Sequence, residues 1–207
     1  SKAFKQYGGT FIALLVLIIL FASLSPHFLN TSNLLNILLQ VSIIAILAFG
    51  MTFVLMIGEI DLSVGSALAL SGVVLGILLA TGINPYIAIL ATLVTGAILG
   101  LFNGVAGAKF GIPTFIVTVA TMELFRGLGY ALTDNRPVSI DDNFILSIGN
   151  QRLFNVIPIP VLIVLVLMVA GHIVLNKTKF GRQLKIIGGN KTAAEYIGIQ
   201  TKKLTII

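Results

Sequence analysis

The sequence predicts an all-α protein, a polytopic transmembrane helix bundle with about six spans. Of its 207 residues, 57% are hydrophobic and only 10% are charged, and the mean hydropathy is +1.08, whereas a soluble domain carries about 25% charged residues. Three long runs, at 6–58, 62–108 and 153–176, contain no charged residue. Uncharged apolar runs of this length are typical of membrane spans of about 20 residues each.

Turn-forming sequences divide these runs into separate spans. Ser-Pro at 25–26 ends the first span, Asn-Pro at 84–85 separates the third from the fourth, and Gly-Ile-Pro at 111–113 separates the fourth from the fifth. Each run is apolar throughout rather than alternating as in a barrel strand, so we predict helices, whose backbone groups are satisfied within lipid. The expected spans are 9–24, 39–57, 62–81, 85–108, 113–132 and 157–175.

Basic residues gather near the C-terminal end and set the expected orientation. Between Lys177 and Lys203 there are seven basic residues and one acidic residue, while the rest of the chain is neutral. Placing both ends in the cytoplasm puts ten of the thirteen basic residues there, as the positive-inside rule requires. The clustering beside a span, without aromatic residues spaced for base stacking, favours membrane lipid over nucleic acid as the contact. Lys2 and Lys5 also fit a signal peptide, but the spans that follow favour a retained first span.

Composition also limits the chemistry of the chain. It contains no cysteine and two histidines, and His27 and His172 lie in the flanks of different spans. Thiol catalysis and cysteine-ligated metals are therefore excluded, and no His/Asp cluster or Ser/Lys pair indicates an intramembrane enzyme. We expect no catalytic residue, no metal site and no cofactor in this chain.

The octapeptide Gly-Glu-Ile-Asp-Leu-Ser-Val-Gly at 58–65 places two acids, Glu59 and Asp61, between long uncharged spans. One interpretation is helix capping, in which Asp61 accepts backbone N–H bonds from Ser63 or Val64 at the start of the third span. The other is an intramembrane acid that takes part in transport. Glu59 is typical of a charge at the membrane interface.

Two further patterns are expected to serve packing. Glu123 and Arg126 lie three residues apart on one face of the fifth span, where pairing would reduce the cost of burying them, and a structural pair is favoured over a proton relay. Small residues recur at every fourth position in the fourth span, and twice in the third, which predicts close helix approach. They are Gly96, Gly100, Gly104 and Ala108, and Gly72 and Gly76.

A short helix over 191–197 is predicted in the basic segment, because Asn190 is a good N-cap and Gly198 suits the residue after the C-terminus. Such a helix is either a connector or a docking helix for a cytoplasmic partner. The neighbouring Gly-Asn-Lys-Thr at 189–192 lacks the Gly-Lys step, the upstream glycine and the preceding strand of a phosphate loop. This chain is therefore not expected to bind ATP itself.

Four motifs, in order, resemble permease subunits of the ribose/xylose/galactoside class of bacterial ABC importers. The octapeptide at 58–65 resembles that family's Gly-Gly-Ile-Asp-Leu-Ser-Val-Gly signature, and 26–40, 121–128 and 181–199 match in the same order. The resemblance implies a type II importer-like fold in the bacterial cytoplasmic membrane and transport of a monosaccharide such as ribose. It also implies three partners: a cytoplasmic ATP-binding subunit, an extracytoplasmic sugar-binding protein and a second permease subunit.

The resemblance also assigns residues, motif by motif. The signature residues are Gly58, Asp61, Leu62, Ser63 and Gly65. The motif that would couple to the ATPase contains Gly188, Gly189, Asn190, Ala193, Ala194, Gly198 and Ile199. Within it, the small side chains of Ala193 and Ala194 are expected to allow the ATPase to approach closely.

This sequence departs from the family pattern at Glu59, where the signature has glycine, and at Glu123, where an uncharged residue is usual. Both changes add charge near the transport path. Polar residues inside the expected spans are candidates for the sugar path: Gln40, Asn103 and Thr118.

Family members continue with further spans, so residues 1–207 are expected to be a single permease domain cut from a longer protein, able to insert into a membrane but not to transport. The alternative function is an ion-coupled secondary transporter, in which Asp61 or Glu123 would carry a proton or a sodium ion. The two functions differ in energy source, which is a partner ATPase in one case and an ion gradient in the other.

Overall fold

The structure is a computed structural model that describes residues 2–154 and 156–206, except for the side chains of residues 2–7. Lys2 and Lys5, which contribute to the expected orientation, therefore have side chains outside the described part. The helices are α1 (Lys2–Leu24), α2 (Thr31–Met56), α3 (Val64–Ala80), α4 (Pro85–Phe110), α5 (Thr114–Thr133), α6 (Asn143–Asn150), α7 (Ile159–Lys177), α8 (Lys179–Gly189), α9 (Lys191–Tyr196) and α10 (Thr201–Ile206).

Each of the six predicted spans coincides with one helix. Four of them, α2, α4, α5 and α7, are long and apolar enough to cross a membrane, and the apolar part of α1 (Gly8–Leu24) and α3 are shorter. Helix α2 begins at Thr31, eight residues before the expected start at position 39, because the polar residues of its first turn are compatible with a helix start. The prediction of an all-α bundle of apolar helices is confirmed.

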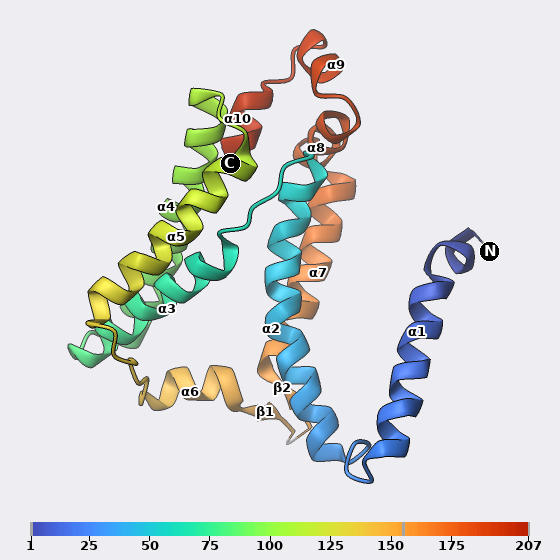
Figure 1. Cartoon of the computed structure of the whole chain (residues 1–207), viewed down its shortest axis with the longest axis vertical. Coiled ribbons are helices and arrows are strands. Elements are labelled where there is room, and N and C mark those ends of the chain that lie inside the picture. Colours follow the sequence, from blue (N-terminus) through green and yellow to red (C-terminus); the bar gives the residue numbers. More distant parts are fainter. Residues whose placement is uncertain (1, 155, 207) are drawn as a thin grey trace.

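The helices form two groups joined by connecting segments. Helix α3 packs against α4 and α5, and α10 packs against α4, while α2 packs against α7 and α8. Figure 1 shows these two groups side by side, with α1 standing apart from both.

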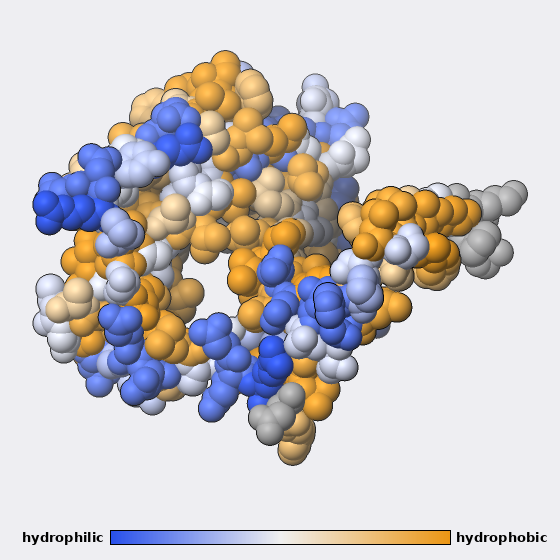
Figure 2. Space-filling model, turned by 60° about the horizontal axis from the view of Figure 1, so that its bottom comes forward, coloured by the Kyte–Doolittle hydropathy of each residue, from blue (hydrophilic) through white to orange (hydrophobic). Residues whose placement is uncertain are grey.

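Large apolar side chains cover the outer faces of the helices. Ile19, Leu93 and Val166 are each more than 60% exposed, and Figure 2 shows hydrophobic surface over most of the visible face, with an opening between its parts. A soluble protein rarely exposes so much contiguous apolar surface. This distribution fits helices that lie in lipid or against further helices.

The segment between α5 and α7 contains regular structure. Asp142 accepts hydrogen bonds from the N–H groups of Phe144 and Ile145, both at 3.0 Å, and so caps α6. Strands β1 (Arg152–Leu153) and β2 (Ile157–Pro158) then form a short antiparallel pair. Helix α6 runs across the molecule between the ends of the two helix groups (Figure 1).

The row of glycines on α4 allows another helix to approach closely at one position and leaves an empty space at another. A Cβ atom at Gly104 would lie 2.9 Å from Ile206 Cα in α10, so α10 packs directly on the α4 backbone there. A Cβ at Gly100 would meet no atom within 4 Å, and neither would one at Gly72. The prediction of close helix approach is therefore wrong at Gly100, because the stripe there borders an open cavity. At Gly76 the close neighbour is Val138, which belongs to a loop.

We predict that Gly104→Ala destabilises the protein by about 1–3 kcal/mol, because the α10 backbone must move to admit the methyl group. Gly100→Ala is the matched control on the same stripe. It should be neutral or stabilising by up to about 1 kcal/mol, because alanine favours the helix and space is available. Thermal unfolding of both purified variants in detergent measures the difference, and equal melting temperatures would contradict the packing described here.

Candidate functional site

The segment that joins α2 to α3 contains the octapeptide singled out in the sequence. Helix α2 ends in a Schellman motif: Gly58 has a φ of +81°, its N–H donates to the Leu55 carbonyl (3.0 Å), and the Glu59 N–H donates to the Val54 carbonyl (3.3 Å). Glycine adopts this left-handed backbone without strain. Residues 59–63, hereafter the signature loop, then run without helical structure from the end of α2 to the start of α3.

Asp61 and Ser63 form a compact turn before α3. One carboxylate oxygen of Asp61 accepts from both the N–H and the hydroxyl of Ser63, each at 2.7 Å. The expected bond to the Ser63 N–H is therefore present, although Ser63, not Asp61, is the N-cap residue of α3. Asp61 acts two residues earlier, as an Asx turn.

Helix α4 holds this turn in place through a buried amide. Ser63 is only 1% exposed, and its Oγ accepts a hydrogen bond of 2.7 Å from Asn103 Nδ2. Among the described residues, the other amide atom, Asn103 Oδ1, is buried without a hydrogen-bond partner. An acceptor left in this state typically costs about 1–3 kcal/mol, so the position of Asn103 is not explained by packing alone.

Helix α5 holds the signature loop from another direction. The fully buried Thr118 hydroxyl lies 3.3 Å from the Ile60 carbonyl and 3.2 Å from the carbonyl of Phe115 in its own helix. Because this loop lies between apolar helices, its backbone carbonyls need such partners. Two side chains, Asn103 and Thr118, thus connect the loop to α4 and α5.

A cavity of about 470 Å³ lies beside this network, within the range of about 300–1,000 Å³ for small-molecule sites. Asp61, Asn103 and Thr118 line it, together with Gly100, whose missing side chain leaves space. Of the three candidates for the sugar path, the structure brings Asn103 and Thr118 together. Gln40 is exposed on α2 and is not among the residues that line this cavity.

The predicted short helix in the basic segment is confirmed as α9. Asn190 Oδ1 accepts from the Ala193 N–H at 2.9 Å, which is the expected N-cap bond. Gly198 has a φ of +82° and closes a second Schellman motif, in which the Ile199 N–H donates to the Ala194 carbonyl at 3.0 Å. Just before α9, Gly188 contacts the Met56 carbonyl so closely that a side chain would overlap it. The basic segment is therefore seated on the end of α2.

The surface of α9 differs from the one expected. Ala193 is exposed, but Ala194 is fully buried within the chain and is not available for close approach by a partner. Two large apolar side chains at the C-terminal end of α9 are strongly exposed, Tyr196 (87%) and the C-cap residue Ile197 (67%). Sequence reasoning missed these two residues, although a large aromatic side chain at the end of a short basic helix is a usable signal.

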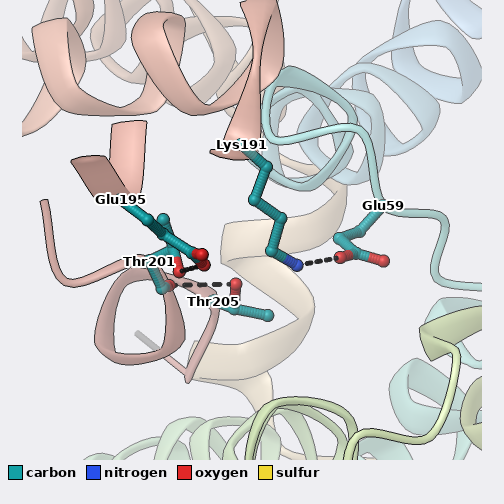
Figure 3. Close-up of polar contacts among 5 residues, drawn as sticks. All are labelled: Glu59, Lys191, Glu195, Thr201 and Thr205. Atoms are coloured by element: carbon teal, nitrogen blue, oxygen red, sulfur yellow. Dashed lines mark hydrogen bonds and ion pairs between the residues drawn. The ribbon is translucent and has the colours of Figure 1, made fainter. Parts of the chain in front are cut away.

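An ion pair connects α9 to the signature loop (Figure 3). Lys191 Nζ lies 3.4 Å from Glu59 Oε1, and the two side chains are 50% and 22% exposed. Nearby, the Thr201 hydroxyl donates to Glu195 at 2.6 Å, and the Thr205 hydroxyl donates to the Thr201 carbonyl at 3.2 Å. An ion pair this exposed contributes about 0–1 kcal/mol. The pair was not predicted, because its members are 132 positions apart.

The pair predicted within α5 is present but faces outward. Arg126 Nη1 lies 3.3 Å from Glu123 Oε1, and the side chains are 52% and 62% exposed. The expected spacing of three residues on one face is confirmed. The face of α5 that is buried within the described part of the chain is formed by other residues, Val117, Thr118, Thr121 and Phe125.

A comparison with known protein families identifies the family of this chain. A family model described as the permease component of the branched-chain amino acid transport system matches residues 33–207. The chain belongs to this permease family. It is therefore a multi-pass membrane protein of a transport family, which confirms the resemblance seen in the four sequence motifs.

Three relatives show how far the similarity extends along the permease. The ribose import permease protein RbsC of Bacillus subtilis (strain 168) is 39% identical over 203 residues, 98% of this chain and 63% of the relative. RbsC of Escherichia coli (strain K12) is 39% identical over 100% of this chain and 65% of the relative. The L-arabinose transport system permease protein AraH of the same strain is 34% identical over 100% of this chain and 62% of the relative.

The permease described here thus spans slightly less than two thirds of the length of these relatives. No solved structure matches the chain.

We predict that Ser63→Ala destabilises the permease by about 1–3 kcal/mol, because it removes two hydrogen bonds and leaves Asn103 Nδ2 buried without its acceptor. Ser42→Ala is the matched control, since Ser42 is also buried but its hydroxyl donates only to the Leu38 carbonyl of its own helix, at 2.6 Å. Thermal unfolding in detergent measures both. An equal loss in the two variants would mean that the turn is not held by this network.

Proposed function

We propose that this chain is the membrane-spanning permease part of an ATP-driven importer for a monosaccharide, ribose or a related sugar. The observation that carries the proposal is the signature loop, which lines the cavity with Asp61 and reaches α9 through Glu59. The names of the relatives supply the substrate class, since they include ribose, allose and arabinose permeases. The chain itself performs no covalent chemistry and works by alternating access.

The cavity beside the signature loop is the proposed part of the sugar path. Sugar hydroxyls both donate and accept hydrogen bonds, and the cavity offers the Asp61 carboxylate as an acceptor and Thr118 as a polar wall. Asn103 also lines this cavity, and its Oδ1 is buried without a partner among the described residues. Gln40, on the outer face of α2, stays a candidate for a separate part of the path.

The proposed orientation places both ends of the chain and α8–α10 in the cytoplasm, following the basic residues of this segment. The motif that contains Gly188, Asn190 and Gly198 then shapes α9 as the contact for a cytoplasmic ATP-binding subunit. Helix α6 and the β1–β2 pair lie at the other end of the molecule, where an extracytoplasmic sugar-binding protein would deliver the substrate. A second permease subunit completes the proposed assembly.

The energy source of sugar uptake distinguishes this proposed function from ion-coupled transport. We expect the full-length protein, reconstituted in vesicles with its ATPase and sugar-binding protein, to take up labelled ribose or arabinose only when ATP is supplied, and to be insensitive to ionophores. Uptake that needs no ATP and is abolished by an ionophore would establish the rival function, an ion-coupled secondary transporter, in which Asp61 or Glu123 carries the ion.

We predict that Tyr196→Ala weakens binding of the ATPase by about 1–3 kcal/mol, because exposed aromatic residues are common anchors of interfaces. Phe154→Ala is the matched control, since Phe154 is 85% exposed but belongs to the segment between β1 and β2 at the opposite end. Co-purification of the ATPase with each full-length variant measures the effect. Equal loss in both variants, or in neither, would contradict α9 as the contact.

A substitution at Ala194 should act differently. Because Ala194 is buried within the chain, Ala194→Trp should displace α9 itself and lower the thermal stability of the isolated permease, not only its affinity for the ATPase. Unchanged stability, together with lost ATPase binding, would show that Ala194 faces the partner instead.

A further inference from the structure

Glu59 occupies a position between two elements that the proposed function requires to move together. We propose that Glu59 is a positioning residue for transport, and that its ion pair with Lys191 transmits displacement of α9 to the signature loop and the cavity. The inference rests on the proposed function and identifies the link within it. In this role Glu59 acts through the loop and does not touch the sugar.

The geometry places the pair at the start of both elements. Glu59 is the residue directly after the turn at Gly58, and Lys191 is the first residue of α9. Figure 3 shows the Lys191 side chain extending from α9 toward the Glu59 carboxylate, which comes from the signature loop. The 3.4 Å ion pair between these two side chains therefore connects α9 directly to the signature loop.

The neighbouring charged groups do not replace either partner. Glu195, the other acid of this region, accepts the Thr201 hydroxyl at 2.6 Å and is turned toward α10 (Figure 3). Lys202 lines the same small cavity of about 240 Å³ as Glu59, Lys191 and Glu195. Among the described residues, the Glu59 carboxylate is paired with Lys191 and not with Lys202, whereas Glu195 is bonded to Thr201.

The signature loop has little slack between the ion pair and the cavity. Asp61 follows Glu59 by two residues, and two residues span at most about 7 Å of extended chain. Within that distance the Ile60 carbonyl is held by Thr118, and Asp61 is held in the turn with Ser63. A shift of Glu59 therefore changes the hydrogen bonds that set the positions of Asp61, Thr118 and Asn103 around the cavity.

An ion pair with this exposure suits a link that must break and re-form. Lys191 is half exposed, so water can solvate its ammonium group when the pair separates. The family signature that this sequence resembles has glycine where this chain has Glu59, and glycine has no side chain that could reach α9. The link therefore belongs to this chain and not to the signature as such.

Charge variants of the full-length protein test the link. In the reconstituted transporter, Glu59→Gln and Lys191→Gln should each lower the amount of sugar taken up per ATP hydrolysed by about two- to fivefold, the limit set by an exposed ion pair. The exchange Glu59→Lys with Lys191→Glu should restore most of it. Lys202→Gln is the matched control, because it removes a lysine of the same cavity without removing the pair, and its ratio should match the wild type.

Cross-linking tests the same link without relying on charge. Residues 1–207 contain no cysteine, so Glu59→Cys with Lys191→Cys, in a protein freed of any other cysteine, gives a unique thiol pair for a short bifunctional maleimide. We expect efficient cross-linking without nucleotide and reduced cross-linking with a non-hydrolysable ATP analogue. The cross-linked protein should keep its ATPase bound and lose the stimulation of ATP hydrolysis by sugar. The same double-cysteine protein without cross-linker should retain part of this stimulation, as the two glutamine variants do.

The outcomes separate this inference from the proposed function. If the wild type shows ATP-driven uptake but both glutamine variants and the cross-linked protein transport normally, the link is overturned and the permease function stands. Cross-linking that is indifferent to nucleotide also overturns the link. If the wild type shows no ATP-driven uptake, the proposed function fails, and the link fails with it.

Discussion

The hydrogen bonds that hold residues 59–63 are the interaction on which the rest of this structure depends. A non-helical segment among apolar helices must find partners for its own backbone and polar groups, because lipid supplies none. Here those partners come from two helices: Thr118 of α5 approaches the Ile60 carbonyl, and Asn103 of α4 reaches Ser63. The same bonds fix α3 between α4 and α5 and leave a polar wall on the neighbouring cavity.

The polar groups of the chain are arranged in series from the basic segment to the interior. Helix α9 is shaped by Asn190 and Gly198, Lys191 reaches Glu59, and Glu59 leads within two residues to Asp61. The pair of Lys191 and Glu59 is the step that joins elements distant in sequence, since these residues are 132 positions apart. Two of the few charges of the chain, Glu59 and Lys191, thus lie where the basic segment meets the end of α2.

The helices could be predicted from the sequence, because long apolar runs and their turn residues report directly on local structure. The Asp61–Ser63 bond and α9 could also be predicted, since both depend on residues a few positions apart. The pairing of Glu59 with Lys191 and the burial of Ala194 could not, because they depend on how α8 and α9 seat against α2. Gly100 could not be interpreted from the sequence for the same reason. A small residue leaves space beside a helix, but the positions of the surrounding helices decide whether another helix occupies that space or a cavity remains.

The shortness of α3 has a consequence for the membrane barrier. Its 17 residues span about 25 Å, less than the hydrocarbon thickness of about 30 Å, whereas the 26 residues of α2 or α4 span about 39 Å. The missing length corresponds to the signature loop, which has no helical structure and is held by hydrogen bonds to its backbone. In this part of the protein, the apolar layer that a polar solute or a column of water must cross is therefore thinner beside α3 than beside α2 or α4.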